Sequence, residues 1–120
     1  MDYKLINPDY LDSVSGGDPE IFNEILSLFK EQTTEIYNEM AAGFSKNNYA
    51  LLGSLAHKAK SSAAIMGMEE LALMLKTFEV QARDGKEPGL YQSYITRFKE
   101  DTDSAIAELE DLVNIRLKVK

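Results

Sequence analysis

The sequence contains no cysteine, no tryptophan and only one histidine, His57, among its 120 residues. Without cysteine, neither a disulfide nor a thiolate-bound zinc ion can form, and a metal site would rest almost wholly on carboxylates. No uninterrupted apolar run approaches the roughly 20 residues that a membrane-spanning helix needs. No apolar stretch follows Met1, as it would in a signal peptide. We therefore expect a cytoplasmic protein with no membrane span and no metal site.

Basic residues are also scarce, because 13 lysines and arginines stand against 20 acidic residues, for a net charge of −7. A chain of this sign is repelled by a phosphate backbone, so we expect no nucleic-acid binding. The 44% hydrophobic fraction is that of an ordinary globular protein. A length of 120 residues suits one domain, and we expect residues 1–120 to form a single unit.

Only three prolines and seven glycines interrupt the chain, and most of them stand where helices are expected to begin or end. Asn7-Pro8 and Asp18-Pro19 are each typical of a helix N-cap followed by a proline at the first helical position. The clearest loop signal is the glycine- and proline-containing segment 84–89. The pattern predicts five helices, with approximate ranges 8–14, 19–43, 46–66, 68–83 and 90–117.

The longer predicted helices are amphipathic. The second carries an apolar stripe near 3.5-residue spacing that includes Phe22, Leu26, Phe29, Ile36 and Met40. No segment shows a sustained alternation of period two, so we expect no sheet. Long amphipathic helices joined by short loops predict an all-α fold: an antiparallel, up-down-up-down four-helix bundle with a short extra N-terminal helix.

The solvent face of the third predicted helix is unusual. At about 100° per residue, His57 points about 140° away from the centre of the core stripe. Its neighbours on this outer face are small: Ala50, Gly53, Ser54, Ser61 and Ala64. Exposed helix faces usually carry long charged side chains. A lone imidazole among small residues therefore indicates a ring that a bulky partner can reach.

The same helix lacks acidic residues. No Asp or Glu occurs from Ser45 to Met68, whereas Lys46, Lys58 and Lys60 lie in this window. Such a patch would attract an anion that the rest of the acidic surface cannot hold. Neutral imidazole is a nucleophile, and Lys60, three residues on, can reach a phosphoryl oxygen bound to it. Ser61 can hydrogen-bond the ring or the phosphate, and Lys58 adds to the local positive potential.

These residues resemble the signature of the histidine-containing phosphotransfer (HPt) family. The likeness lies in the segment from Ala56 to Ala63, followed by Gly67, Leu71 and Phe78-Glu79. The family pattern has a histidine, a lysine at +3, a small residue at +4, a glycine at +10 and a leucine heptad in the next helix. The segment 10–20 also resembles the family's junction between its first two helices. Two departures are Ser61, where glycine is commoner, and Phe78, in place of leucine.

The resemblance implies a phosphorelay intermediate. His57 would accept a phosphoryl group on its outer ring nitrogen from the aspartyl phosphate of one receiver domain and pass it to the aspartate of another. The receiver, of a hybrid sensor kinase or a response regulator, would supply Mg²⁺ and the acidic pocket. The chain itself would bind no cofactor, act as a monomer and have no autonomous catalytic activity. By the same analogy the receiver would contact residues beside the histidine, and we expect these to be Leu11, Val14, Ala50, Ser54 and Ala64.

Two other classes of function compete with the phosphorelay interpretation. A helical adaptor that binds receivers or other signalling domains without phosphotransfer would share the same bundle. Only the transfer of a labelled phosphoryl group to His57 distinguishes a carrier from such an adaptor. A metal-dependent enzyme built inside the bundle would need inward Glu-x-x-His pairs on several helices. No Glu-x-x-His occurs in the sequence, which argues against this class.

Overall fold

The computed structural model describes residues 5–118, which form five α-helices and one 3₁₀ turn and contain no strand. The helices and the turn are α1 (Pro8–Ser15), α2 (Pro19–Ser45), α3 (Tyr49–Ile65), α4 (Glu69–Asp84), η1 (Pro88–Leu90) and α5 (Tyr91–Lys118). The predicted all-α class is confirmed, and each predicted helix is present within a few residues of its expected ends. The segment predicted as a loop after α4 leads into η1, which ends where α5 begins.

Local side chains define where the first three helices begin. The side chains of Asn7 and Asp18 accept hydrogen bonds from the backbone N–H groups of Tyr10 (3.2 Å) and Glu20 (2.9 Å). Asn48 does the same for α3, accepting from the N–H of Leu51 at 3.2 Å. These bonds satisfy backbone donors that have no partner in the first helical turn. The predicted caps of α1 and α2 are therefore present, and Asn48 fixes the start of the helix that carries His57.

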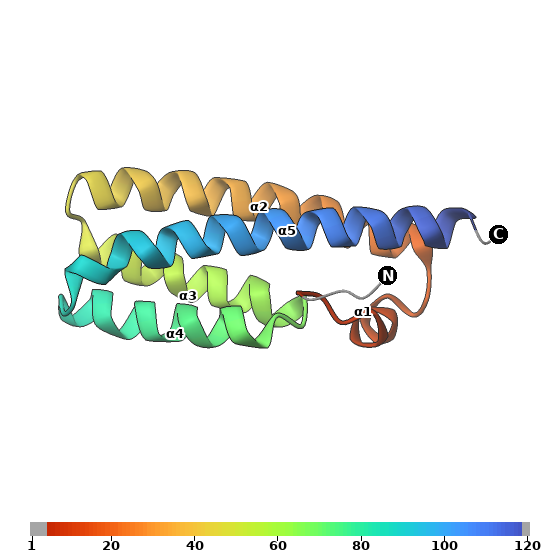
Figure 1. The fold of residues 1–120 in the computed structure, drawn as a ribbon, viewed down its shortest axis with the longest axis horizontal. Helices are drawn as coiled ribbons and strands as arrows, with labels where there is room; N and C mark the ends of the chain where they lie inside the picture. The colour runs from red at the N-terminus through yellow and green to blue at the C-terminus, as the bar shows by residue number, and fades with distance from the viewer. Residues whose placement is uncertain (1–4, 119–120) are drawn as a thin grey trace.

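Helices α2 to α5 run in alternating directions and pack side by side as a four-helix bundle (Figure 1). The neighbouring pairs are α2 with α3, α3 with α4, α4 with α5, and α5 with α2. The short helix α1 lies at one end of the bundle, beside the turn between α3 and α4 (Figure 1). The alternating directions of α2 to α5 give the predicted up-down-up-down arrangement (Figure 1). Within the described part of the chain, no helix combines the length and apolar character needed to cross a membrane.

The core is formed by the predicted stripes. Its largest fully buried side chains include Phe78 of α4 and Tyr91 and Phe98 of α5. The rings of Phe78 and Tyr91 lie 5.4 Å apart, and the hydroxyl of Tyr91 lies 2.9 Å and 2.6 Å from the backbone oxygens of Gln81 and Lys86. Burial, with nearby tyrosines and acidic groups, raises the pKa of Tyr91. This aromatic cluster fixes α4 against α5.

A glycine turn joins α3 to α4. Gly67 has a φ of +75°, a backbone conformation that favours glycine. A Cβ atom at this position would lie 3.1 Å from Cδ1 of Tyr10, so the ring of Tyr10 rests on the turn. Gly67 therefore lets the chain turn from α3 into α4, and α1 is held against the end of α3 through this contact.

Candidate functional site

His57 lies on the exposed face of α3. Its side chain is 56% exposed, and its neighbours Ala50, Ser54, Ser61 and Ala64 are all exposed small residues. The leucines and alanines on the opposite face of α3 are buried in the core. The structure thus places the imidazole on the outside of the bundle, as the helical pattern predicted, among small exposed side chains of α3.

The surroundings of His57 differ from the sequence expectation in one respect, because a carboxylate contacts the ring. Nδ1 of His57 lies 3.1 Å and 3.2 Å from the two carboxylate oxygens of Glu79, a residue of α4. The expectation that no acidic group lies near the ring was therefore wrong. The segment from Ser45 to Met68, which includes α3, contains no acidic residue. The acidic residue that contacts the ring comes from α4, the helix packed beside α3.

Glu79 is the centre of a small charge cluster. Its side chain is only 9% exposed and accepts from Nζ of Lys60 at 3.1 Å and from Nη2 of Arg83 at 3.0 Å. Burial raises the pKa of Glu79, but the hydrogen bonds from Lys60 and His57 and the charge of Arg83 together outweigh this effect. The net pKa of the carboxyl group is lower than usual. Glu79 is therefore ionised at neutral pH.

An ionised Glu79 sets the proton position on the imidazole. A carboxylate can only accept hydrogen bonds, so Nδ1 of His57 must be the protonated nitrogen in this contact. In a neutral imidazole the other nitrogen, Nε2, then carries the free lone pair. The cluster thus holds His57 in the tautomer whose nucleophilic atom lies on the side of the ring away from Glu79.

The three residues expected around a phosphoryl group have different surroundings. Lys60 is paired with Glu79 and lies in the α3–α4 seam. Ser61 is exposed, and its hydroxyl donates to the backbone oxygen of His57 at 3.3 Å, the oxygen one helical turn before it. Lys58 is exposed on α3. The structure therefore keeps Lys60 and Ser61 within one helical turn of His57, and it adds Glu79 and Arg83, which the sequence analysis did not assign to the site.

Gly53 was expected on the open outer face, but it is buried. A Cβ atom at Gly53 would lie 2.8 Å from Cγ of Arg83, so the aliphatic part of that arginine covers it. Helical periodicity places Gly53 near the outer face of α3. It does not reveal that a long side chain from α4 crosses there.

The predicted docking residues do not all lie at the surface. Leu11 is 1% exposed and belongs to the core, so its prediction as a partner contact was wrong. Its place in the apolar stripe of α1 is the physical reason, because this short helix must bury that stripe to pack on the bundle. The side chain of Val14 lies outside the described residues. Ala50, Ser54 and Ala64 are exposed as expected.

An exposed apolar face between α2 and α3 was missed by the sequence analysis. Leu28 of α2 and Ile65 of α3 are both more than half exposed, and Ile21 lies two turns before Leu28. A shallow depression of about 170 Å³ lies between α2 and α3, and Ile25, Leu28 and Ile65 contribute to its lining. Ile21 and Leu28 are seven residues apart and lie off the core stripe of α2, a signal that the sequence contains. We call Ile21, Ile25, Leu28 and Ile65 the α2–α3 apolar face.

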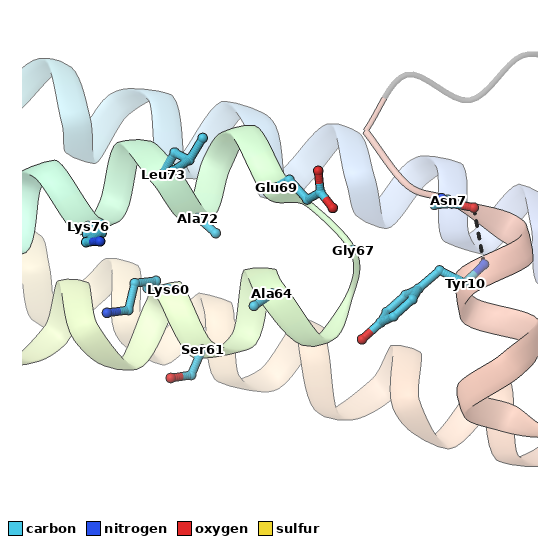
Figure 2. Close-up of a pocket in the computed structure, with 10 residues that line it drawn as sticks. All are labelled: Asn7, Tyr10, Lys60, Ser61, Ala64, Gly67, Glu69, Ala72, Leu73 and Lys76. Atoms are coloured by element: carbon cyan, nitrogen blue, oxygen red, sulfur yellow. Dashed lines mark hydrogen bonds between the residues drawn. The ribbon is translucent and has the colours of Figure 1, made fainter.

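A larger groove of about 680 Å³ lies between α1, α3 and α4. Figure 2 shows Tyr10 at one end of it and Lys60 and Lys76 at the other, with Ala64 and Ala72 between them on facing helices. Lys60 therefore belongs both to the groove and to the Glu79 cluster. Among residues 5–118, no group of three His, Asp or Glu side chains could hold a metal ion.

Comparison with known proteins gives a family and a similar fold. The sequence model of the Hpt domain family matches residues 24–114, three quarters of the chain and the whole of α3 and α4. No curated protein matches the sequence. The fold is similar to the crystal structure of histidine-containing phosphotransfer protein B (HptB) from Pseudomonas aeruginosa PAO1, with a TM-score of 0.85 at 18% identity. That match covers 94% of this chain and 97% of the HptB chain.

Proposed function

Because this chain belongs to the Hpt domain family, whose members transfer phosphoryl groups in two-component phosphorelays, we propose that His57 is the residue that carries the phosphoryl group. The observation that carries this proposal is that the chain has a single histidine and that its ring stands 56% exposed on α3. A phosphohistidine relay through this domain has no other residue to use. The small exposed neighbours on α3 leave room for a receiver domain to approach the ring.

The chemistry follows from the tautomer that Glu79 favours. The lone pair of Nε2 attacks the phosphorus of an aspartyl phosphate on the receiver, the bond between phosphorus and the acyl oxygen breaks, and the aspartate leaves as a carboxylate. Nδ1 keeps its proton, so the phosphorylated ring carries a positive charge that the carboxylate of Glu79 balances. The reverse sequence delivers the phosphoryl group to the aspartate of an acceptor receiver. This chain neither gains nor loses a proton in either step.

The remaining groups neutralise charge and guide the partner. Lys60, one turn from His57, interacts with a phosphoryl oxygen in this proposal. Lys58 directly follows His57 on the same helix, and Ser61 directly follows Lys60. We assign Mg²⁺ to the acidic pocket of the receiver. The receiver supplies that chemistry, and this chain acts as a carrier without catalytic activity of its own. A single bundle contains the whole site, so a monomer suffices.

We place the receiver over the α2–α3 apolar face. Leu28 and Ile65 expose large apolar surface on α2 and on α3, the helix that carries His57, and burial of such surface drives association. Ser54 and Ala50 of α3 extend this face along the helix that carries His57, whereas Ala64 lies on the side of α3 that borders the groove. The receiver therefore contacts α2 and α3, with His57 at the edge of the interface.

The direct test supplies a phosphorylated receiver and Mg²⁺ to the wild-type protein, to His57→Gln and to Ser104→Gln. Ser104 is an exposed residue of α5 and provides the matched control. The wild type and Ser104→Gln should gain label that is labile in acid and stable in alkali, and His57→Gln should gain none. Binding of the receiver without any transfer of label to the wild type would indicate an adaptor instead. Label on His57→Gln equal to the wild type would refute the assignment of His57.

A further inference from the structure

Arg83, near the end of α4, lies beside the site without a role in the chemistry described above. Its Nη2 atom lies 3.0 Å from Oε2 of Glu79, the same oxygen that lies 3.1 Å from Nδ1 of His57. The guanidinium and the imidazole are therefore within two hydrogen-bond lengths of each other. The side chain of Arg83 is more than half exposed, so its guanidinium is free to change partners.

The route of Arg83 to the site passes over Gly53. The position where a Cβ of Gly53 would stand is 2.8 Å from Cγ of Arg83, a separation that real Cβ atoms do not adopt. Gly53 lies one helical turn before His57 on α3, in the middle of a helix, where alanine would be more favourable for the isolated helix. The missing side chain lets the aliphatic part of Arg83 lie against α3 while its guanidinium pairs with Glu79, the residue that contacts His57.

Glu79 can release Arg83 without losing its other partners. Lys60 contacts Oε1 at 3.1 Å, and Nδ1 of His57 contacts both oxygens. A buried carboxylate becomes costly when it is left without a compensating donor, but two donors remain here. Lys60 is more buried than Arg83. Arg83 is therefore the cation of the cluster that can move at the smaller cost.

We propose that Arg83 is a phosphoryl-binding residue, and that its guanidinium moves from Glu79 to the phosphoryl oxygens when His57 is phosphorylated. This inference rests on the proposed function of His57. Phosphorylation brings new negative charge to the ring, and the planar guanidinium can bind two phosphoryl oxygens at once. In the resting protein Glu79 holds Arg83 beside the imidazole, on its Nδ1 side, and the exposed side chain moves from there to the phosphoryl group on Nε2. The exchange makes and breaks ion pairs only and adds no covalent step.

Phosphorylation by potassium phosphoramidate tests the role of Arg83 without a receiver, so that docking does not affect the result. The rate of phosphohistidine formation is followed by ³¹P NMR for the wild type, Arg83→Gln, Arg83→Lys and Arg97→Gln. Arg97 is the matched control, because it forms an i,i+4 ion pair with Asp101 on α5 and is similarly exposed. Arg83→Gln should slow the reaction about three- to tenfold, less than the loss of a fully buried donor. Arg83→Lys should be intermediate, and Arg97→Gln should react like the wild type.

A second readout follows the guanidinium itself. The ¹H–¹⁵N signal of Nε of Arg83 is identified by its loss in Arg83→Gln, and it should shift when the wild type is phosphorylated, whereas the signal of Arg97 should not. A purely structural Arg83 would not give this shift. An Arg83 signal that stays in place while His57 becomes phosphorylated, together with a wild-type rate for Arg83→Gln, would overturn the proposal.

Gly53→Ala tests the route of the side chain. It should slow phosphorylation in the wild-type background and add little in the Arg83→Gln background, because the methyl group meets Cγ of residue 83 in both but only the wild type has a guanidinium that this contact can displace from the site. Equal slowing in both backgrounds would mean that the methyl group acts through helix packing, and it would refute the role of Gly53. Failure of the proposed function has a different outcome, since the wild type would then gain phosphate on His57 from neither phosphoramidate nor a phosphorylated receiver.

Discussion

Replacement of Glu79 by glutamine tests the charge cluster under His57. The glutamine amide keeps the size of the side chain but removes its negative charge and turns one acceptor into a donor. Lys60, Arg83 and Nδ1 of His57, which all point donors at this carboxylate, would then compete for one amide oxygen. The amide nitrogen would face at least one of these donors. We expect Glu79→Gln to be destabilised.

The loss of stability expected for Glu79→Gln can be estimated from the burial of Glu79 and the exposure of its partners. Charge-assisted hydrogen bonds contribute roughly 1.5–3 kcal/mol each when buried. Here only Glu79 is buried, while His57 and Arg83 are more than half exposed, so solvent screens much of the interaction. We therefore expect the free energy of unfolding at pH 7 to fall by about 1–2 kcal/mol. In a domain of this size this corresponds to a fall of roughly 4–8 °C in the melting temperature.

The pH dependence has a definite sign. The pKa of Glu79 is lower in the folded protein than in the unfolded chain. Its carboxylate therefore stabilises the fold fully above the unfolded pKa, about 4.3, and this contribution is lost as the pH falls through the folded value. The difference between the wild type and Glu79→Gln should thus be complete at pH 7 and should shrink below about pH 4.

Urea unfolding at pH 7 and pH 3, followed by circular dichroism, measures this difference. Glu110→Gln is the control, because Glu110 forms an exposed ion pair with Lys30 at 3.4 Å and should lose less than about 0.5 kcal/mol. A Glu79→Gln variant as stable as the wild type at pH 7 would refute the reasoning. So would a difference that is the same at pH 3 as at pH 7.

Two further comparisons test the turn below the site and the docking face. Gly67→Ala should lower stability by about 1–2 kcal/mol, because its φ is +75° and the new methyl group would press on Tyr10. Gly89→Ala, which meets no atom within 4 Å, should change thermal stability little, and equal losses would contradict this account. Leu28→Ala should lower kcat/KM for transfer from a phosphorylated receiver several-fold, whereas Leu73→Ala should not, although Leu73 of α4 is at least as exposed as Leu28. Equal effects of the two leucine variants would argue against docking over α2 and α3.

Most of the fold could be predicted from the sequence. The proline-containing caps at Asn7 and Asp18 and the apolar stripes depend on neighbours in the chain, and the structure has them as expected. Each of these features is set within one helix, where residue spacing determines which side chain faces the core.

The site was predicted only in part, because much of it is formed between helices. The exposed position of His57 on α3 follows from helical periodicity. Its contact with Glu79 depends on the register of α4 against α3, which no spacing within either helix specifies. The burial of Gly53 has the same origin, since Arg83 covers it from α4. Leu11 shows the opposite error, because analogy placed it in the interface although its own helix needs it for packing.

The most direct test of the central claim is NMR of the ring nitrogens of His57 after phosphorylation by a phosphorylated receiver. The chain has one histidine, so its ring gives a single set of ¹⁵N signals. We predict coupling of phosphorus to Nε2 and a proton on Nδ1, which is hydrogen-bonded to Glu79. Phosphorus coupled to Nδ1, or a phosphorylated protein whose imidazole signals are unchanged, would contradict the account.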